Sequence, residues 1–273
     1  MKGKAVNLNA FFSQHAVFTL KELDRFLAGK GSRNRYTRSS LLSYYRQQGR
    51  IISIRRGLYA VMPHGMSPDR SPVDPYLLAA KMASDATLAY HTALAFYGNA
   101  YSTFEQFYYL SGRRSAPVKF RTYEFRCVVT PRILRTKGKE MFGVNRLERS
   151  GVSVMVTSLE RTLVDVLKRP DLSGSWEEIW RSLESVEYFD LDRVVEYTLM
   201  LENGTTAAKV GFFLEQHRES LMVEDEQLKP LLDLRPRRPH YLERGKRTAG
   251  RLVTNWNLVL PKEVLHRSWG EVL

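Results

Sequence analysis

Hydrophobic spacing in the first sixty residues predicts a small helical module that ends in a β-hairpin. Residues 7–14 can form a first helix. Thr19 stands where an N-cap belongs, and apolar residues follow it at helical spacing from Leu20 to Leu27, so we expect a second helix there. Gly29 and Gly31 end that helix, and the chain then enters a turn.

A third helix is predicted to begin near Tyr36 or Thr37 and to run to Gln48, with Gly49 placed to end it. One side of this helix is apolar. At about 100° per residue, the opposite side collects polar and basic residues, namely Tyr36, Ser39, Ser43 and Arg46.

After the third helix, the period of the hydrophobic pattern shortens from about 3.6 residues to two, which indicates strands. Residues 51–54 and 58–61 are predicted to pair as a hairpin through a turn of Arg55, Arg56 and Gly57. Gly57 can adopt the positive φ that such a tight turn needs. The order helix, helix, turn, helix, hairpin is that of a winged helix-turn-helix, which we assign to residues 1–65.

Residues 64–74 concentrate Gly, Pro, Ser and Asp, so we expect a linker there and assign it to residues 66–74. Beyond it, residues 75–156 are predicted to form a lobe of mixed helices and strands. Helices are expected at 75–83 and 88–97, and aromatic or β-branched runs predict strands at 104–110, 123–129 and 152–156.

Residues 157–273 are predicted to form a mainly helical lobe. Its expected helices span 158–168, 175–185, 190–202 and 205–220, and Trp256 in the tail is expected to pack back onto the rest. The fold class is therefore predicted to be α+β. An N-terminal winged helix-turn-helix domain precedes a larger mixed α/β domain, residues 75–273, which is helix-rich toward its C-terminal part.

Charge is distributed unevenly along the 273 residues. Residues 1–63 hold twelve Lys or Arg against two acidic residues, an excess of +10, whereas the whole chain carries +13. Residues 140–226 hold eighteen acidic and nine basic residues. A basic module joined to a larger, nearly neutral remainder favours a polyanion as the partner of the module, and nucleic acid is the obvious one.

A winged helix binds DNA by placing its third helix in the major groove and its wing along the backbone. Arg is both a phosphate ligand and the commonest reader of guanine, so Arg35 at the start of the helix is the best candidate for a base contact. The full candidate DNA-binding set is Arg33, Arg35, Tyr36, Ser39, Ser43, Arg46, Arg55 and Arg56. The alternative is a solvated surface, or a winged helix that binds protein.

The segment 157–174, TSLERTLVDVLKRPDLSG, predicts a helix. Thr157 and Glu160 have the spacing of a capping box, and Arg161 and Asp165 are expected to pair on its surface. We interpret this segment as a helix that packs its apolar side in the core. The alternative is a helix that contacts a partner protein.

Motifs of catalytic and cofactor sites are missing from the sequence. It has no Walker A loop, no GxGxxG and no HExxH, and its six histidines are scattered without metal-ligand spacing. His91 lies in an aromatic helical segment, where a core histidine is expected. We therefore expect no catalytic residue, no cofactor and no metal site. We also expect neither a membrane span nor a signal peptide, and a cytoplasmic protein.

Three segments carry a resemblance to a known family. The wing IRRGLYAV (54–61), the segment YHTALAFYG (90–98) and the helix TSLERTLVDVLKRP resemble the AbiEi family of bacterial antitoxins in their order and spacing. The resemblance spans most of the chain, from about residue 7 to residue 220. Each motif alone is only moderately specific, and their succession carries the match.

The resemblance implies a type IV toxin-antitoxin, or abortive-infection, system used in phage defence. In that family the winged helix represses its own operon by binding inverted repeats in promoter DNA, and the C-terminal region neutralises a nucleotidyltransferase-like toxin, directly or indirectly. For this chain it implies an antitoxin role for residues 75–273, where the acidic stretch 140–226 is one candidate contact surface for a basic toxin. The alternative function is a nucleic-acid-modifying enzyme that the winged helix targets to DNA.

Overall fold

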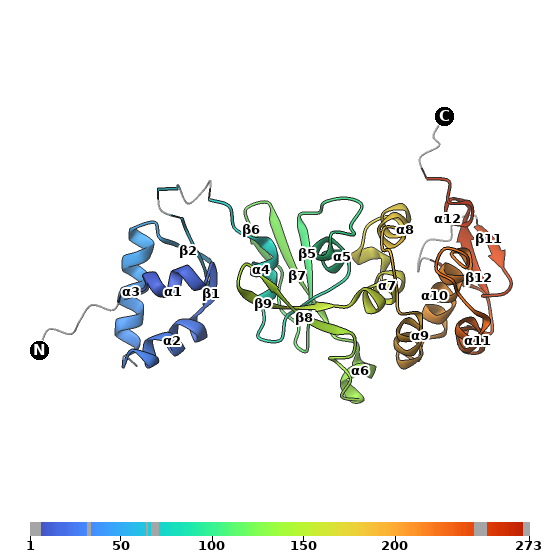
Figure 1. The fold of residues 1–273 in the computed structure, drawn as a ribbon, viewed down its shortest axis with the longest axis horizontal. Coiled ribbons are helices and arrows are strands. Elements are labelled where there is room, and N and C mark those ends of the chain that lie inside the picture. The colour runs from blue at the N-terminus through green and yellow to red at the C-terminus, as the bar shows by residue number, and fades with distance from the viewer. Residues whose placement is uncertain (1–6, 32–33, 64, 67–70, 243–249, 270–273) are drawn as a thin grey trace, which may run out of the picture.

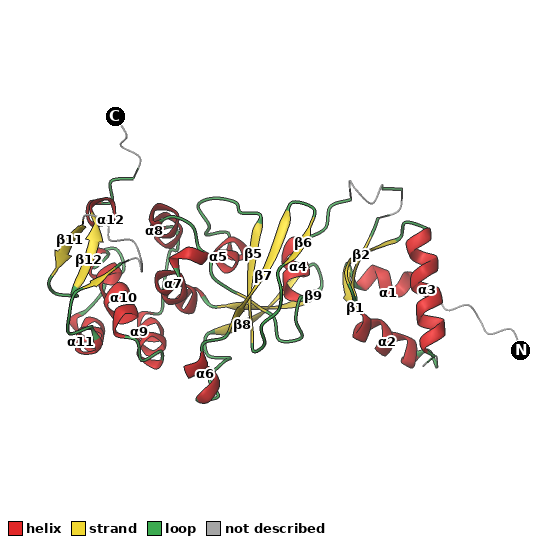
Figure 2. Cartoon of the chain, turned by 180° about the vertical axis from the view of Figure 1, so that it is seen from behind, coloured by secondary structure: helices red, strands yellow, loops and turns green. Residues whose placement is uncertain are grey.

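The molecule is elongated, with three parts in chain order along its long axis (Figures 1 and 2). A computed structural model describes residues 7–31, 34–63, 65–66, 71–242 and 250–269. A winged helix forms one end, a sheet with flanking helices forms the middle, and a helical lobe with a small sheet forms the other end. The α+β class expected from the sequence is confirmed.

The winged helix contains the predicted elements and one additional strand. Its helices are α1 (Asn9–Gln14), α2 (Leu20–Gly29) and α3 (Arg35–Gln47), and its strands are β1 (Val17–Thr19), β2 (Ile51–Arg55) and β3 (Leu58–Val61). Thr19 caps α2 in a complete capping box with Glu22. Strand β1 was not predicted, because three residues are too few to show a period of two. It pairs with β3, giving the sheet order β1-β3-β2.

The sheet of the winged helix is covered on both faces. Phe18 and Ile51 pack under its own helices together with Phe11 and Leu23. From the other face, Val17, Ile54, Leu58, Ala60 and Met62 join one apolar cluster with residues of the middle part. The predicted linker accordingly ends early, because Ser71 and Val73 are buried. The winged helix is thus packed against its neighbour.

A six-stranded mixed sheet in the order β6-β7-β5-β4-β9-β8 forms the middle part. Its strands are β4 (Thr87–Leu88), β5 (Gln106–Ser111), β6 (Val118–Phe120), β7 (Tyr123–Val129), β8 (Val144–Arg149) and β9 (Val152–Thr157). Three helices accompany it, namely α4 (Pro75–Ala80), α5 (His91–Tyr97) and α6 (Arg132–Thr136). β5 pairs in parallel with β7, and β4 in parallel with β9.

The predicted helix 88–97 is wrong at its start. Leu88 belongs to β4, between β5 and β9, and the helix begins only at His91. Two residues of strand are too short to recognise in sequence, and burial on both faces of the sheet removes any alternation of polar and apolar residues.

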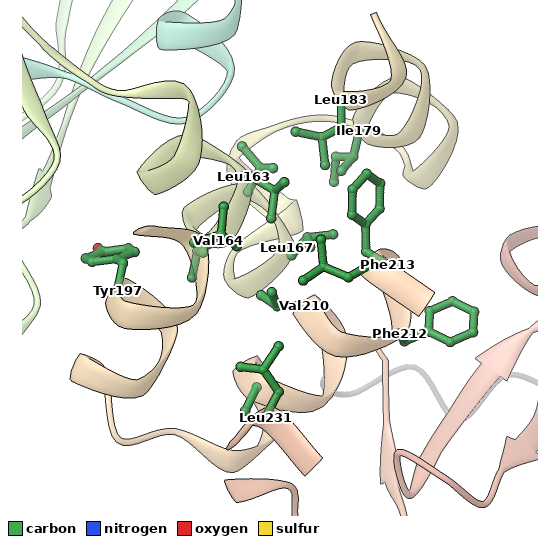
Figure 3. Packing of buried hydrophobic residues seen from close by; sticks show 14 of the residues in the cluster. Leu163, Val164, Leu167, Ile179, Leu183, Tyr197, Val210, Phe212, Phe213 and Leu231 are labelled. Carbon is green, nitrogen blue, oxygen red and sulfur yellow. The ribbon is translucent and has the colours of Figure 1, made fainter. Parts of the chain in front are cut away.

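The C-terminal lobe contains five helices, with α7 at the centre of their packing (Figure 3). They are α7 (Leu159–Lys168), α8 (Trp176–Glu184), α9 (Leu191–Met200), α10 (Gly204–Gln216) and α11 (Asp225–Leu234), with a short 3-10 turn, η1 (Pro170–Leu172), after α7. Figure 3 shows Leu163, Val164 and Leu167 of α7 among side chains from α8, α9, α10 and α11.

Two expectations about α7 are wrong. Its N-cap is Ser158, which accepts a hydrogen bond from the amide of Arg161, whereas the Thr157 hydroxyl is buried against Thr162. Arg161 and Asp165 do pair, at 3.4 Å, but they are buried inside the lobe and not on its surface. Their i,i+4 spacing is typical of an exposed helix face, so sequence could not separate the two cases.

The tail folds back onto the lobe, as expected. Strands β10 (His240–Tyr241), β11 (Gly250–Val253) and β12 (Leu258–Pro261) form a small sheet, followed by α12 (Lys262–His266). Trp256 is fully buried and stands against Gly211 of α10, where a Cβ would lie 2.1 Å from the indole. The lobe is therefore less purely helical than predicted. Among the described residues, no helix has the length and apolar character needed to cross a bilayer.

Candidate nucleic-acid interface

One side of α3 is open to solvent along the whole helix. Tyr36 is 82% exposed, and Ser39, Ser43 and Arg46 are exposed as well. These are the four polar and basic residues that helical spacing assigns to one side, and the structure brings them together there. In both overall views, α3 lies at the far end of the molecule, with the winged-helix sheet between it and the middle part. A long, straight ligand can therefore reach this side of α3 without meeting the middle part or the C-terminal lobe (Figures 1 and 2).

The opposite side of α3 is held firmly. Leu42 is buried, and the Tyr45 ring packs edge-on against Phe12 with 4.9 Å between ring centroids. Arg38 forms an ion pair with Asp24 of α2, with 2.6 Å between Nη1 and Oδ2. Because Arg38 forms this ion pair with α2, its charge helps to hold α3 in place, and we do not count it among the groups on the open side of α3.

Two predicted site residues, Arg33 and Arg35, lie at or just before the N-terminus of α3 in the sequence. Asn34 caps the helix by accepting a hydrogen bond from the amide of Tyr36 at 2.8 Å. Arg35 is the first residue of α3, as the prediction for a base contact requires, although its side chain lies outside the described part. Arg33 falls outside the described residues altogether.

The two arginines of the wing have different environments. Arg56 is exposed beside Gly57, whose φ of 85° gives the tight turn that was predicted. Arg55 is half-buried and donates a hydrogen bond from Nη2 to the carbonyl oxygen of Met82, across the contact with the middle part. The structure therefore places Arg55 in an internal contact, and Arg56 alone of the pair points to solvent.

Three further residues complete the open side of α3. Ser40, Tyr44 and Gln47 are exposed, and they continue the spacing of Tyr36 and Ser43 by three or four residues. The same helical spacing could have identified them in sequence. Gln is a common partner of adenine, so Gln47 adds a base-reading group to the hydroxyls and rings. We call the exposed set Tyr36, Ser39, Ser40, Ser43, Tyr44, Arg46 and Gln47 the α3 face.

The expected core histidine is indeed internal. His91 is 1% exposed, stacks on Phe104 at 3.7 Å between ring centroids, and lies 3.2 Å from Glu178 Oε1. Burial lowers its pKa despite the opposing charge and hydrogen bond of Glu178. Glu178 also accepts hydrogen bonds from Ser182 and from the backbone amide of Ser102. These bonds join α5, α8 and the loop before β5.

Comparison with known proteins shows a likeness to a solved structure. No family model and no curated protein matches the sequence. Among solved structures, the crystal structure of the RV2827C protein from Mycobacterium tuberculosis is similar, with a TM-score of 0.60 over 94% of this chain and 92% of that chain. The identity is 16%, so the likeness shows a shared fold.

Proposed function

We propose that this chain is a DNA-binding antitoxin that represses its own promoter through the α3 face and neutralises a nucleotidyltransferase-like toxin with the rest of the chain. The observation that carries the DNA-binding part is the α3 face itself. It is a continuous polar surface on the helix that a winged helix inserts into the major groove, and it lies at the free end of the molecule. The excess of +10 in residues 1–63 supports the same partner.

DNA binding is tested by gel shifts of the full chain on its own promoter over a series of salt concentrations. Arg46→Ala and Arg56→Ala should each weaken binding and lower the slope of log affinity against log salt by about 1, because each removes one phosphate contact. Arg55→Ala, its neighbour in sequence, should leave that slope unchanged, since its guanidinium bonds Met82. The exposed Arg146 of β8 offers a matched control.

Unchanged affinity and unchanged slope in both Arg46→Ala and Arg56→Ala would remove the α3 face and the wing turn from the DNA contact. Metal-dependent cleavage of the promoter by the purified protein would instead favour a nucleic-acid-modifying enzyme.

For the toxin, we infer that the contact surface is acidic and lies on α9 and α11. Asp165 and Glu178 are buried and belong to the core, so only part of the acidic stretch 140–226 is available to a partner. Asp192 and Glu196 are exposed one turn apart on α9, and Gln227 of α11 donates to Asp192 at 3.2 Å. The exposed Asp225 and Glu226 begin α11 beside it. A toxin that handles nucleotides is expected to present complementary basic surface.

The acidic surface is tested by growth rescue on co-expression with the product of the neighbouring gene. The double variant Asp192→Lys, Glu196→Lys should lose toxin neutralisation while keeping promoter binding, since their helix α9 lies far from α3 (Figure 1). Glu148→Lys, an exposed charge reversal on β8, should rescue growth like the unaltered chain. Full rescue by the double variant would contradict the assignment of this surface.

A further inference from the structure

A cavity of about 230 Å³ opens at the carboxyl ends of β5 and β7. Gly112 and Thr130, which follow these two parallel strands, both line it. Thr87 of β4, Arg135 of α6 and Arg161 of α7 form much of the remaining wall. Segments far apart in sequence thus converge at the carboxyl edge of parallel strands, a common place for ligand sites in α/β sheets.

Arg161 gives this cavity its chemical character. Its side chain is 1% exposed, and its Nη1 donates to the carbonyl oxygens of Glu140 and Phe142 at 2.8 and 2.7 Å. Nε lies 3.4 Å from Asp165, whereas the buried Nη2 has no hydrogen-bond partner among the described residues. The guanidinium also lies over the Tyr197 ring, 5.2 Å from its centroid. A buried donor without an acceptor is costly, and a ligand oxygen bound in the adjoining cavity would supply one.

The other polar groups of the wall fall into two kinds. Arg135 and the hydroxyls of Thr87 and Thr130 can donate hydrogen bonds. Asp85 and Glu140 can only accept them when ionised. Burial acts to raise the pKa of Asp85, but hydrogen bonds from the Gly112 amide and the Ser111 hydroxyl outweigh it, so the pKa is lowered and Asp85 is an anion at neutral pH.

We propose that this cavity binds a small phosphate monoester that also carries hydroxyl or amino groups, such as a sugar phosphate or a nucleoside monophosphate. Arg161 Nη2, Arg135 and the two threonine hydroxyls supply donors for the phosphate oxygens, and guanidinium groups suit phosphate in both charge and shape. Asp85 accepts from the hydroxyl or amino groups of the ligand. The wall has nearly balanced charge, which favours such a mixed ligand over a bare polyanion. The site is independent of the α3 face and of DNA binding.

Isothermal titration of the full chain with inorganic phosphate, ribose 5-phosphate and adenosine 5′-monophosphate tests the site. We expect saturable one-to-one binding of at least one ester, tighter than that of inorganic phosphate because Asp85 adds a contact. The double variant Thr130→Val, Arg135→Gln should weaken ester binding at least about tenfold, since it removes a hydroxyl and a charged donor without altering Arg161. Arg46→Gln, on the α3 face, should bind the ester like the unaltered chain.

Three results would overturn the proposal: no saturable binding of any of the three probes, equal affinity of the double variant, or equal affinity for inorganic phosphate and both esters. Loss of ester binding in Arg46→Gln would show that the ester binds at the α3 face, and this result would also overturn the proposal. A melting curve of each variant shows that it is folded, so that lost binding reports on the site.

Discussion

At the scale of single residues, burial changes how much an i,i+4 ion pair on a helix contributes to stability. Arg161–Asp165 and Arg181–Glu177 are both i,i+4 ion pairs on helices. The first is buried, and Asp165 also accepts from the Tyr197 hydroxyl at 2.9 Å. Burial together with the neighbouring Asp165 raises the pKa of Tyr197, so this phenol stays a donor to the carboxylate. The second pair is about one third exposed and is screened by water.

Removing one charge from each pair should therefore have unequal effects on the free energy of unfolding. Asp165→Asn leaves the guanidinium of Arg161 buried without its counter-charge, and we expect a loss of about 3–5 kcal/mol. Glu177→Gln should cost less than about 1 kcal/mol, because exposed pairs contribute little. Urea unfolding of both variants measures the difference. Equal small losses would mean that the Arg161–Asp165 pair does not hold α7 in place.

At the scale of elements, close packing decides which positions tolerate a side chain. Helix α10 approaches the tail so closely that Gly211 leaves room only for the indole of Trp256, whose Nε1 donates to Glu215 on the same helix at 2.7 Å. The strand β1 depends on a similar context, since β3 is its one partner among the described strands. Elements of this kind are fixed by their partners, which are distant in sequence.

Helix α3 is the contrasting case. Its approximate length and its two sides follow from local spacing, although its N-cap Asn34 was not predicted. The structure places Tyr36, Ser39, Ser43 and Arg46 on one exposed side, as helical spacing predicts. The wing also forms where it was predicted, yet its contact with Met82 redirects Arg55. Local pattern thus fixes an element, and the neighbouring domain decides which of its side chains remain available.

At the scale of the whole molecule, the winged helix and the middle part are joined by apolar and ionic contacts. They share the apolar cluster that contains Leu58 and Leu77, and Glu22 of α2 forms an ion pair with Lys81 after α4. Burial alone would raise the pKa of Glu22, but hydrogen bonds from Lys81 and Thr19 and the charge of Lys81 lower it overall. The orientation of α3 relative to the rest of the chain is therefore set by direct contacts.

This contact should weaken in acid. Because the folded-state pKa of Glu22 is below its ordinary value of 4.5, the stabilisation is present above that pH and is lost as the pH falls through the lowered value. The protection of amides in β1–β3 and α4 against hydrogen exchange, corrected for the intrinsic exchange rate at each pH, should fall over that range, and Glu22→Gln should remove this loss of protection.

Asp24→Asn is the matched control, since Asp24 pairs with Arg38 inside the winged helix. It should leave the acid response of the contact intact. An acid response that persists in Glu22→Gln would show that the Glu22–Lys81 pair does not hold the two parts together.

The sequence by itself determined the helices of the winged helix, most helices of the C-terminal lobe, the hairpin, the excess of basic residues in the winged helix and the residues that helical spacing places on the open side of α3. Those features depend on neighbours within one or two turns, so a local period reports them. Only the tertiary structure decided that Arg161 is buried, that Arg55 points inward and that Asp85, Thr130 and Arg135 line one cavity. A side chain becomes buried, and cavity residues come together, only when segments distant in sequence meet. The spacing of residues within one segment is the same whether that segment faces water or another part of the chain.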